Sequence, residues 1–131
     1  MEVRRAYQLE VIQRSKPGLL GQVLQSLAMD GAELRGVCTY NQGDKGVIQL
    51  IPHEPERAER ALKNAGYASV RKEVVVVEGE DKPGIVADLG RRLGKAGIDI
   101  EFLYAAGTPG GRFLAVFQTA NISAAFETLT K

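Results

Sequence analysis

The sequence predicts an α+β fold: two β-α-β-β-α-β modules, each with an antiparallel sheet, packed together. One observation is a repeat, because Ser15-Lys16-Pro17-Gly18-Leu19-Leu20 recurs 66 residues later as Asp81-Lys82-Pro83-Gly84-Ile85-Val86. The same offset equates Gly31 with Gly97 and Leu50 with Val116. The other observation is that strand-like and helix-like apolar patterns follow the same order in both halves. A repeat of this length indicates that each copy is a folding unit.

The first copy begins with a strand, a corner and a helix. Residues 7–13 alternate apolar and polar side chains, which is typical of a half-buried strand. After the Lys-Pro-Gly corner, apolar side chains follow helical spacing over residues 19–28. We expect Pro17 in the first turn of this helix, Ser15 or Lys16 near its cap, and Gly31 just after its end.

The first copy continues with a hairpin and a second helix. Strands at 32–40 and 47–51 flank a polar, glycine-rich turn. The helix begins after Pro55 and ends at Gly66, with four apolar side chains on one face. Simple alternation along the first of these strands predicts that one face carries Ala32, Leu34, Gly36 and Cys38.

The second copy repeats this order but ends early. Residues 69–78 are long for one strand, so we expect them to finish the first module and to begin the second. A helix after Gly84, a strand with Ile98, Ile100, Phe102 and Tyr104 on one face, a turn at 107–111, a strand at 113–117 and a helix at 122–130 follow.

The module boundaries follow from the repeat, with residues 1–71 as the first module and 72–131 as the second. The second lacks its last strand, which would leave an unpaired sheet edge. Residues 2–5 carry a valine and two basic residues, as residues 69–72 do before the fifth strand. We therefore expect residues 2–5 to complete the second sheet, in the same chain or in a partner.

Composition and charge narrow the class of protein. The net charge of +1 lacks the positive excess of nucleic-acid-binding proteins, and no apolar run approaches the roughly 18 residues that span a bilayer. No signal peptide is visible at the N-terminus, so we expect a cytoplasmic protein that binds neither nucleic acid nor membrane. Cys38 is the single cysteine, which excludes an intrachain disulfide and predicts a small buried side chain.

The sequence shows no catalytic or metal-binding constellation. His53 is the only histidine and has no cysteine near it, so we expect no metal site and no catalytic triad. The glycines of residues 107–111 lack a P-loop lysine and are typical of a turn. The order of basic and aromatic residues at 111–117 differs from that of an RNA-recognition module. We therefore predict that the chain is not an enzyme and needs no cofactor.

These residues resemble one family. The Lys-Pro-Gly corner, the helix that ends at glycine and the following Ile98-Asp99-Ile100 strand are similar to the ACT domain, a regulatory module that commonly binds amino acids. Nearly the whole chain resembles the free-standing tandem ACT proteins. The resemblance implies ferredoxin-like modules whose sheets pair side by side, with an effector where two modules meet. The first copy departs from the family pattern at Ser15 and at residues 32–34, which puts binding by both copies in doubt.

The resemblance and the chemistry of the corner suggest the site residues. A ligand carboxylate can dock on backbone N–H groups at a helix start, and glycine allows close approach. Asp81 or Asp99 would then hold the ligand's ammonium group, whereas Lys16 and Lys82 would be solvated. The alternative is that Asp81 only caps the helix. Ligand-binding candidates are Asp81, Pro83, Gly84, Ile85, Val86, Asp99, Ser15, Gly18, Leu19 and Leu20, with the second copy favoured.

The sequence therefore predicts a regulatory, allosteric sensor that binds a small-molecule effector, an amino acid or a similar compound, at the interface between its modules. It would act by changing its association with itself, as a homodimer, or with a partner enzyme. The alternative is a ligand-free dimerisation or regulatory subunit that acts on a partner enzyme.

Overall fold

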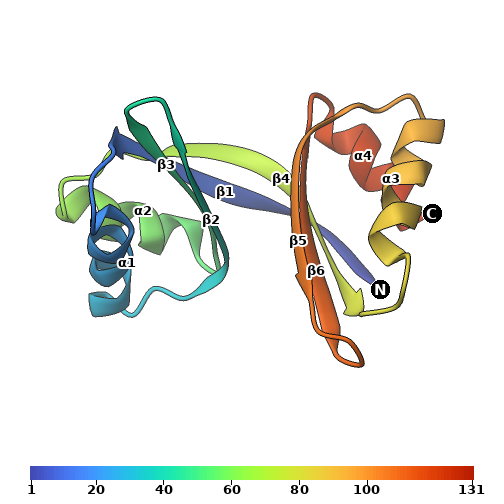
Figure 1. The fold of residues 1–131 in the computed structure, drawn as a ribbon, viewed down its shortest axis with the longest axis horizontal. Helices are drawn as coiled ribbons and strands as arrows, with labels where there is room; N and C mark the ends of the chain where they lie inside the picture. Colours follow the sequence, from blue (N-terminus) through green and yellow to red (C-terminus); the bar gives the residue numbers. More distant parts are fainter. The chain divides into compact units, whose positions relative to one another are not determined.

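The computed structural model describes residues 1–131 and contains six strands and four helices (Figure 1). The order of strands and helices is the order that the sequence pattern predicts in each half. No helix is both long and apolar enough to cross a membrane. The elements are β1 (Glu2–Arg14), α1 (Leu19–Met29), β2 (Leu34–Gln42), β3 (Lys45–Pro52), α2 (Pro55–Asn64), β4 (Val70–Glu80), α3 (Ile85–Lys95), β5 (Ile100–Gly107), β6 (Arg112–Thr119) and α4 (Ile122–Thr130).

The chain separates into two compact modules, which exchange a strand segment at their ends. The N-terminal module is Tyr7–Lys72, and the C-terminal module combines Met1–Ala6 with Glu73–Lys131. Hydrogen-bonded neighbours run β2-β3-β1-β4-β6-β5, so each module draws on four consecutive strands of this order, and β1 and β4 contribute to both modules. Each module is thus a βαββαβ unit with a sheet of antiparallel strands, the α+β ferredoxin-like class that the sequence predicts.

Residues 1–6 belong to the C-terminal module through specific contacts. Val3 packs against its hydrophobic core. The Arg4 guanidinium lies 3.2 Å from the Glu78 carboxylate, and Arg5 lies 2.7 Å from Glu73. Burial lowers the pKa of Arg4, but its hydrogen bond with Glu78 and the charge of that carboxylate outweigh the burial, so the pKa is raised. The start of β1 thus lies in the module whose copy of the repeat lacks a last strand.

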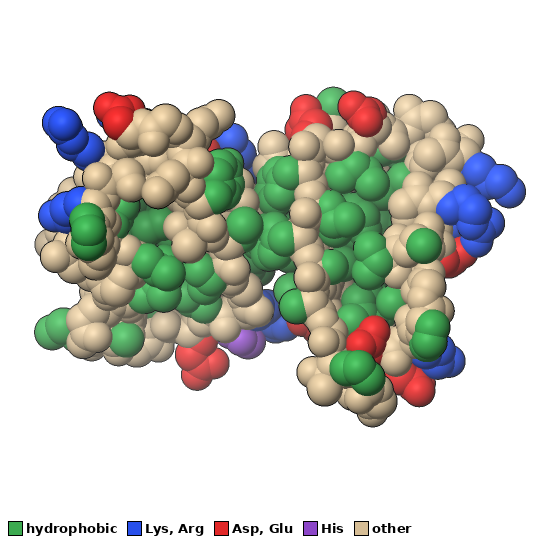
Figure 2. Space-filling view, in the orientation of Figure 1, with side chains coloured by type: hydrophobic (Ala, Val, Ile, Leu, Met, Phe, Trp, Pro, Cys, Tyr) green, Lys and Arg blue, Asp and Glu red, His purple; other side chains and the backbone are tan.

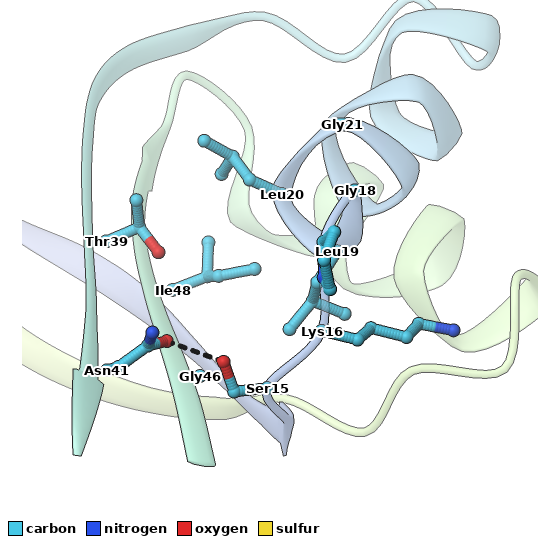
Figure 3. Close-up of a pocket in the computed structure, with 11 residues that line it drawn as sticks. Ser15, Lys16, Gly18, Leu19, Leu20, Gly21, Thr39, Asn41, Gly46 and Ile48 are labelled. Carbon is cyan, nitrogen blue, oxygen red and sulfur yellow. Dashed lines mark hydrogen bonds between the residues drawn. The ribbon is translucent and has the colours of Figure 1, made fainter. Parts of the chain in front are cut away.

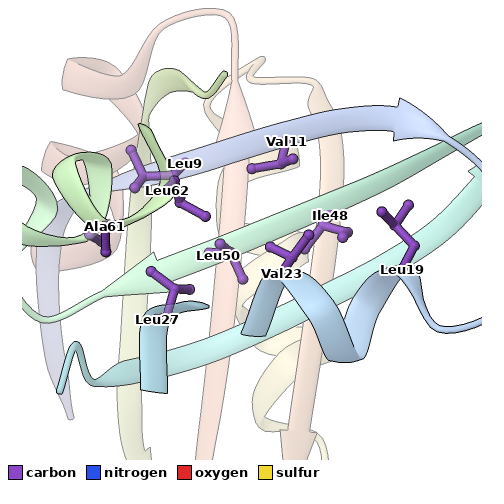
Figure 4. Close-up of a cluster of buried hydrophobic side chains, with 10 residues drawn as sticks. Leu9, Val11, Leu19, Val23, Leu27, Ile48, Leu50, Ala61 and Leu62 are labelled. Carbon is purple, nitrogen blue, oxygen red and sulfur yellow. The ribbon is translucent and has the colours of Figure 1, made fainter. Parts of the chain in front are cut away.

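Each module has its own apolar core beneath its helices. In the N-terminal module, α1 and α2 cover one face of the sheet, and side chains from both helices meet those of β1 and β3 (Figure 4). Fully burying one such leucine stabilises the fold by about 1.5–3 kcal/mol. Figure 2 shows hydrophobic side chains in the middle of each module and charged ones towards its margins. The C-terminal core contains Val75, Val77, Leu89, Leu93, Phe113, Ala115, Phe117, Ala125 and Leu129.

A β-bulge in β2 changes which residues share a face. The register shifts between Leu34 and Gly36, so one residue is inserted and the alternation reverses. Leu34 packs against the helix-covered core, whereas Cys38 lies opposite Gln49 on the other face. The prediction that Ala32, Leu34, Gly36 and Cys38 share one face is therefore wrong. Cys38 is half-buried rather than fully buried.

The same irregularity recurs in β5. The register shifts between Ile100 and Phe102, so Ile100 packs against the core while Phe102 and Tyr104 lie on the opposite face. Their rings stack with centroids 5.9 Å apart. The predicted common face of Ile98, Ile100, Phe102 and Tyr104 is thus wrong for the same reason. Period-two alternation cannot reveal a bulge, because a bulge is a local change in pairing.

The strand ladders also correct the repeat alignment beyond the hairpin. Leu9 pairs with Leu50 in the first copy, and Val75 pairs with Phe117 in the second. Leu50 is therefore equivalent to Phe117, not to Val116, because the second hairpin contains one additional residue. The backbone agrees, since the Ser15 N–H donates to the Asp44 carbonyl in one copy and the Asp81 N–H donates to the Gly111 carbonyl in the other, both at 2.8 Å.

Candidate functional site: the Lys-Pro-Gly loops

The two Lys-Pro-Gly loops start their helices in the same way. Gly18 and Gly84 are the N-cap residues of α1 and α3, with φ angles of 88° and 81° in the left-handed region that favours glycine. No side chain caps either helix. The prediction that Pro17 lies in the first helical turn is wrong, because Pro17 precedes the cap. The alternative in which Asp81 caps α3 is likewise contradicted.

A cavity of about 470 Å³ opens beside the loop of the N-terminal module (Figure 3). Its wall on one side is the loop and the first turn of α1, and on the other side it is the β2–β3 hairpin. The lining residues are Ser15, Lys16, Pro17, Gly18, Leu19, Leu20, Gly21, Thr39, Asn41, Gly46 and Ile48.

The cavity combines polar and apolar walls. The Ser15 hydroxyl donates to Asn41 Oδ1 at 2.9 Å, and the Thr39 hydroxyl donates to the Val47 carbonyl at 3.0 Å. The first backbone N–H groups of a helix have no acceptor within the helix, and none here receives a side-chain cap. Leu20 and Ile48 supply the apolar wall. The site can therefore offer backbone donors to an anionic group and an apolar surface to a side chain.

Gly46 explains why this cavity has room. A Cβ atom at Gly46 would lie 2.8 Å from Cδ2 of Leu19, so any side chain there would displace Leu19. Gly46 pairs with Gln13 on β1, and the equivalent pair in the second copy is Phe113 with Gly79. Phe113 is only 4% exposed and packs in the C-terminal core. A buried phenyl ring thus replaces the hydrogen atom that leaves the first copy open.

The polar pair of the first copy is also replaced in the second. Ser15 and Asn41 correspond to Asp81 and Gly107. A Cβ atom at Gly107 would lie 2.7 Å from Oδ2 of Asp81, so the Asp81 carboxylate occupies the space that an asparagine would need. Asp81 therefore packs against the end of β5. The loop is the same in both copies, but its surroundings differ.

The structure brings some predicted site residues together and separates others. Ser15, Gly18, Leu19 and Leu20 line the cavity of the first copy. Asp81, Pro83, Gly84, Ile85 and Val86 form the corresponding loop of the second. Asp99 is exposed just before β5, whereas Asp81 contacts the last residue of that strand, about 25 Å away at 3.3 Å per residue. Asp99 therefore does not join Asp81 within this module.

Sequence reasoning missed the residues that the hairpin contributes. Thr39, Asn41 and Gly46 come from β2 and β3, and their approach to the loop depends on strand pairing. Gly21, in the first turn of α1, was also missed, although its lack of a side chain inside a helix could have indicated a reason for glycine there.

No metal centre is evident elsewhere. No group of three or more His, Cys, Asp or Glu side chains is arranged to hold a metal ion. His53 lies 3.9 Å from the Glu33 carboxylate, and both side chains are exposed. Arg71 forms an ion pair with Glu59 on the module surface. The hydrogen bond with Glu59 raises the pKa of the Arg71 guanidinium.

Comparison with known proteins identifies the family. A family model described as an ACT domain pair matches residues 4–131. The chain belongs to the ACT domain pair family. The resemblance noted in the sequence is therefore confirmed. The two ACT modules are regulatory modules of the amino-acid-binding, ferredoxin-like type.

Solved structures with the ACT arrangement are similar over almost the whole chain. A protein from Bacteroides thetaiotaomicron is 26% identical with a TM-score of 0.88, over 98% of this chain and 88% of that one. The ligand-free regulatory subunit of aspartate kinase from Thermus thermophilus is 18% identical with a TM-score of 0.69, over 98% and 94%. Aspartate kinase from Synechocystis is 18% identical with a TM-score of 0.57, over 97% of this chain and 25% of that one. The two kinase similarities support the fold alone. Among curated protein sequences, none matches this chain.

Proposed function

We propose that this ACT pair is a regulatory sensor, without enzymatic activity of its own, that binds an amino acid or similar effector in the cavity of its N-terminal module. The observation that carries the proposal is the cavity of about 470 Å³ against the uncapped first turn of α1. A cavity of this size is in the usual range for small-molecule sites. Membership of a regulatory family supports a sensing role.

The chemistry of the walls fits an amino-acid-like ligand. The ligand's α-carboxylate accepts hydrogen bonds from the backbone N–H groups of Gly18 and Leu20, where the helix dipole also favours negative charge, whereas the Leu19 N–H donates to the Lys16 carbonyl at 3.3 Å. The oxygens of Ser15 and Asn41 accept hydrogen bonds from an amino or hydroxyl group. The ligand's side chain lies against the apolar wall. This assignment moves the preferred site from the second copy to the first.

Regulation follows from binding to one state more tightly than to another. A ligand present at 100 times its Kd stabilises the bound state by about 2.7 kcal/mol. That free energy can shift an association with a second copy or with a partner enzyme only as far as the ligand's affinity differs between the free and associated states. The controlled activity then resides on another chain.

The second loop is retained as a weaker candidate. Asp81 could hold an ammonium group near Gly84, Ile85 and Val86, as the sequence suggests. Binding there would require Asp81 to leave its position against Gly107. The open first copy therefore has the better support.

The test is a thermal-shift screen of the twenty amino acids, followed by calorimetric titration of each compound that raises the melting temperature. Gly21→Leu projects a side chain into the cavity from an exposed helical position at which a Cβ atom has free space. Gly94→Leu makes the same change at an exposed position of α3 and is the matched control. We expect Gly21→Leu to abolish binding and Gly94→Leu to retain it. Equal binding by both variants would remove the site from this cavity, and no binding by the wild type would refute the sensor.

The ligand-free alternative has one structural observation in its favour. β2 and β5 are the outer strands of the sheet order and carry partly exposed apolar side chains: Val37, Tyr40 and Leu103 are 40%, 46% and 38% exposed. Unpaired strand edges favour pairing with another chain, so a homodimer or a complex with a partner enzyme can form without an effector. Light scattering with and without the effector separates the two proposals, because only a sensor changes its association when the ligand is added.

A further inference from the structure

A second cavity lies on another side of the same loop. It has a volume of about 430 Å³. It shares Ser15, Lys16 and Leu19 with the cavity of about 470 Å³ described above, which we call the effector cavity. Figure 3 shows the Lys16 side chain extending away from Asn41 and Ser15, so its charge is directed out of the first cavity. The residues that line the second cavity are Gln13, Arg14, Ser15, Lys16, Leu19, Gln22 and Tyr67.

The charges around these two cavities are all positive. Arg14 and Lys16 are exposed, and neither forms an ion pair, in contrast to Arg57 and Arg71, which pair with carboxylates in the same module. No aspartate or glutamate lines either cavity. The neighbouring Asp44 contacts the loop through its backbone carbonyl. A bound group near Arg14 and Lys16 therefore meets two cations that no protein carboxylate neutralises.

The second copy shows that the fold does not require this positive charge. Arg14, Ser15 and Gln22 correspond to Glu80, Asp81 and Asp88, while Lys16 corresponds to Lys82. Two positive charges in the first copy thus become one positive and three negative charges in the second. The loops have the same backbone conformation at their glycine caps. Because the shared fold tolerates both patterns, the charge of the first copy is free to serve ligand selection.

We propose that the effector is a small dicarboxylate with net negative charge, an inference that rests on the proposed sensing function. One carboxylate lies on the backbone N–H groups of Gly18 and Leu20 in the effector cavity, and the other extends past the wall of Ser15, Lys16 and Leu19, which lines both cavities, towards Arg14 and Lys16. Hydrogen bonds between ionised partners are stronger than neutral ones, and arginine can bind a carboxylate through two of them. Lys16, which the sequence pattern predicts to be solvated, becomes a residue that determines specificity.

The cavity also disfavours ligands that lack the second carboxylate. The neutral oxygens of Ser15 and Asn41 receive the ammonium group of any amino acid, so a ligand without a second carboxylate differs only in leaving Arg14 and Lys16 without an anionic partner. A neutral side-chain amide has nearly the same shape as the corresponding acid but provides no charge to Arg14. The selection is thus electrostatic, and it is measurable with pairs of compounds of equal size.

The test compares aspartate with asparagine and glutamate with glutamine by calorimetric titration, together with the corresponding 2-oxo dicarboxylates. A hydrogen bond to a charged group contributes about 1.5–3 kcal/mol. Whichever of aspartate and glutamate fits the site better should therefore bind roughly 10- to 100-fold more tightly than its own amide. Arg14→Gln should remove most of this preference with little effect on amide binding. Arg60→Gln, at an exposed position of α2 outside both cavities, should leave the preference unchanged.

The outcomes separate this inference from the proposed function. Binding of asparagine or glutamine as tightly as of the acids overturns the dicarboxylate inference but leaves the sensor intact. Tighter binding of the 2-oxo acids than of the amino acids supports the inference and identifies an organic acid as the source. Displacement by an equal concentration of inorganic phosphate, with no preference between acids, shows nonspecific anion binding and overturns it. If no amino acid or dicarboxylate binds, both proposals fail.

Discussion

Removal of residues 2–5 tests the most unusual feature of the chain, the exchange of β1 between the modules. The deletion joins Met1 to Ala6 and leaves the N-terminal module, Tyr7–Lys72, complete in sequence. It exposes one edge of β4 in the C-terminal module, because β1 is the hydrogen-bonded neighbour of β4. We propose that this segment completes the second sheet within the same chain.

The expected loss in the free energy of unfolding follows from the contacts that the deletion removes. Burying Val3, which is half-buried, contributes about 1 kcal/mol. The Arg4–Glu78 pair, with side chains 23% and 22% exposed, contributes about 1 kcal/mol, and the more exposed Arg5–Glu73 pair contributes less. Each lost backbone hydrogen bond costs about 1 kcal/mol, but released chain entropy of about 1–2 kcal/mol per residue offsets these bonds. The free energy of unfolding should therefore fall by roughly 2–3 kcal/mol.

The assay is thermal and urea unfolding combined with hydrogen exchange. A loss of this size lowers the melting temperature of a small domain by roughly 10–20 °C. Exchange should increase in β4 and β6 but not in β2 and β3, which provide the internal control. The decrease should be independent of protein concentration, since a strand supplied by a partner would make it concentration-dependent. An unchanged melting curve, or equal exchange in both modules, would refute the reasoning.

Three further predictions concern the C-terminal core and the two loops. Phe113→Ala removes a buried ring from the C-terminal core and should cost about 3–5 kcal/mol in urea unfolding, so a loss below about 1 kcal/mol would contradict the packing described. Gly18→Ala should lower the free energy of unfolding by about 1–2 kcal/mol, because the φ angle of Gly18 is 88°. Gly21→Ala in the same turn should instead raise it by up to about 1 kcal/mol. Thermal melts that show equal effects of the two substitutions would argue against the glycine cap. Gly107→Ala places a methyl group 2.7 Å from Asp81 Oδ2 and should lower the free energy of unfolding by about 1–3 kcal/mol. In a double-mutant cycle, Asp81→Ser should recover most of this loss. Purely additive effects would show that the two residues do not interact.

Within the candidate site, the sequence located the loop but not the cavity. The repeat of Lys-Pro-Gly identified Ser15, Gly18, Leu19 and Leu20, because a helix start has a local pattern. It did not identify Asn41 or Gly46, which meet the loop only through the pairing of β1, β2 and β3. The sequence also favoured the second copy, on the basis of Asp81. The packing of Asp81 against Gly107 depends on tertiary distance, which no local pattern contains.

By itself, the sequence determined the order of the strands and helices, the duplication and the ACT family resemblance, because periodicity, glycine and proline act through local backbone preferences. Only the tertiary structure decided which faces the bulged strands present and which copy of the loop stays open. Those features depend on register, and one inserted residue in a hairpin or strand moves every later side chain. Gly46 and Phe113 are the clearest case, because these equivalent positions become a cavity wall in one module and part of the hydrophobic core in the other.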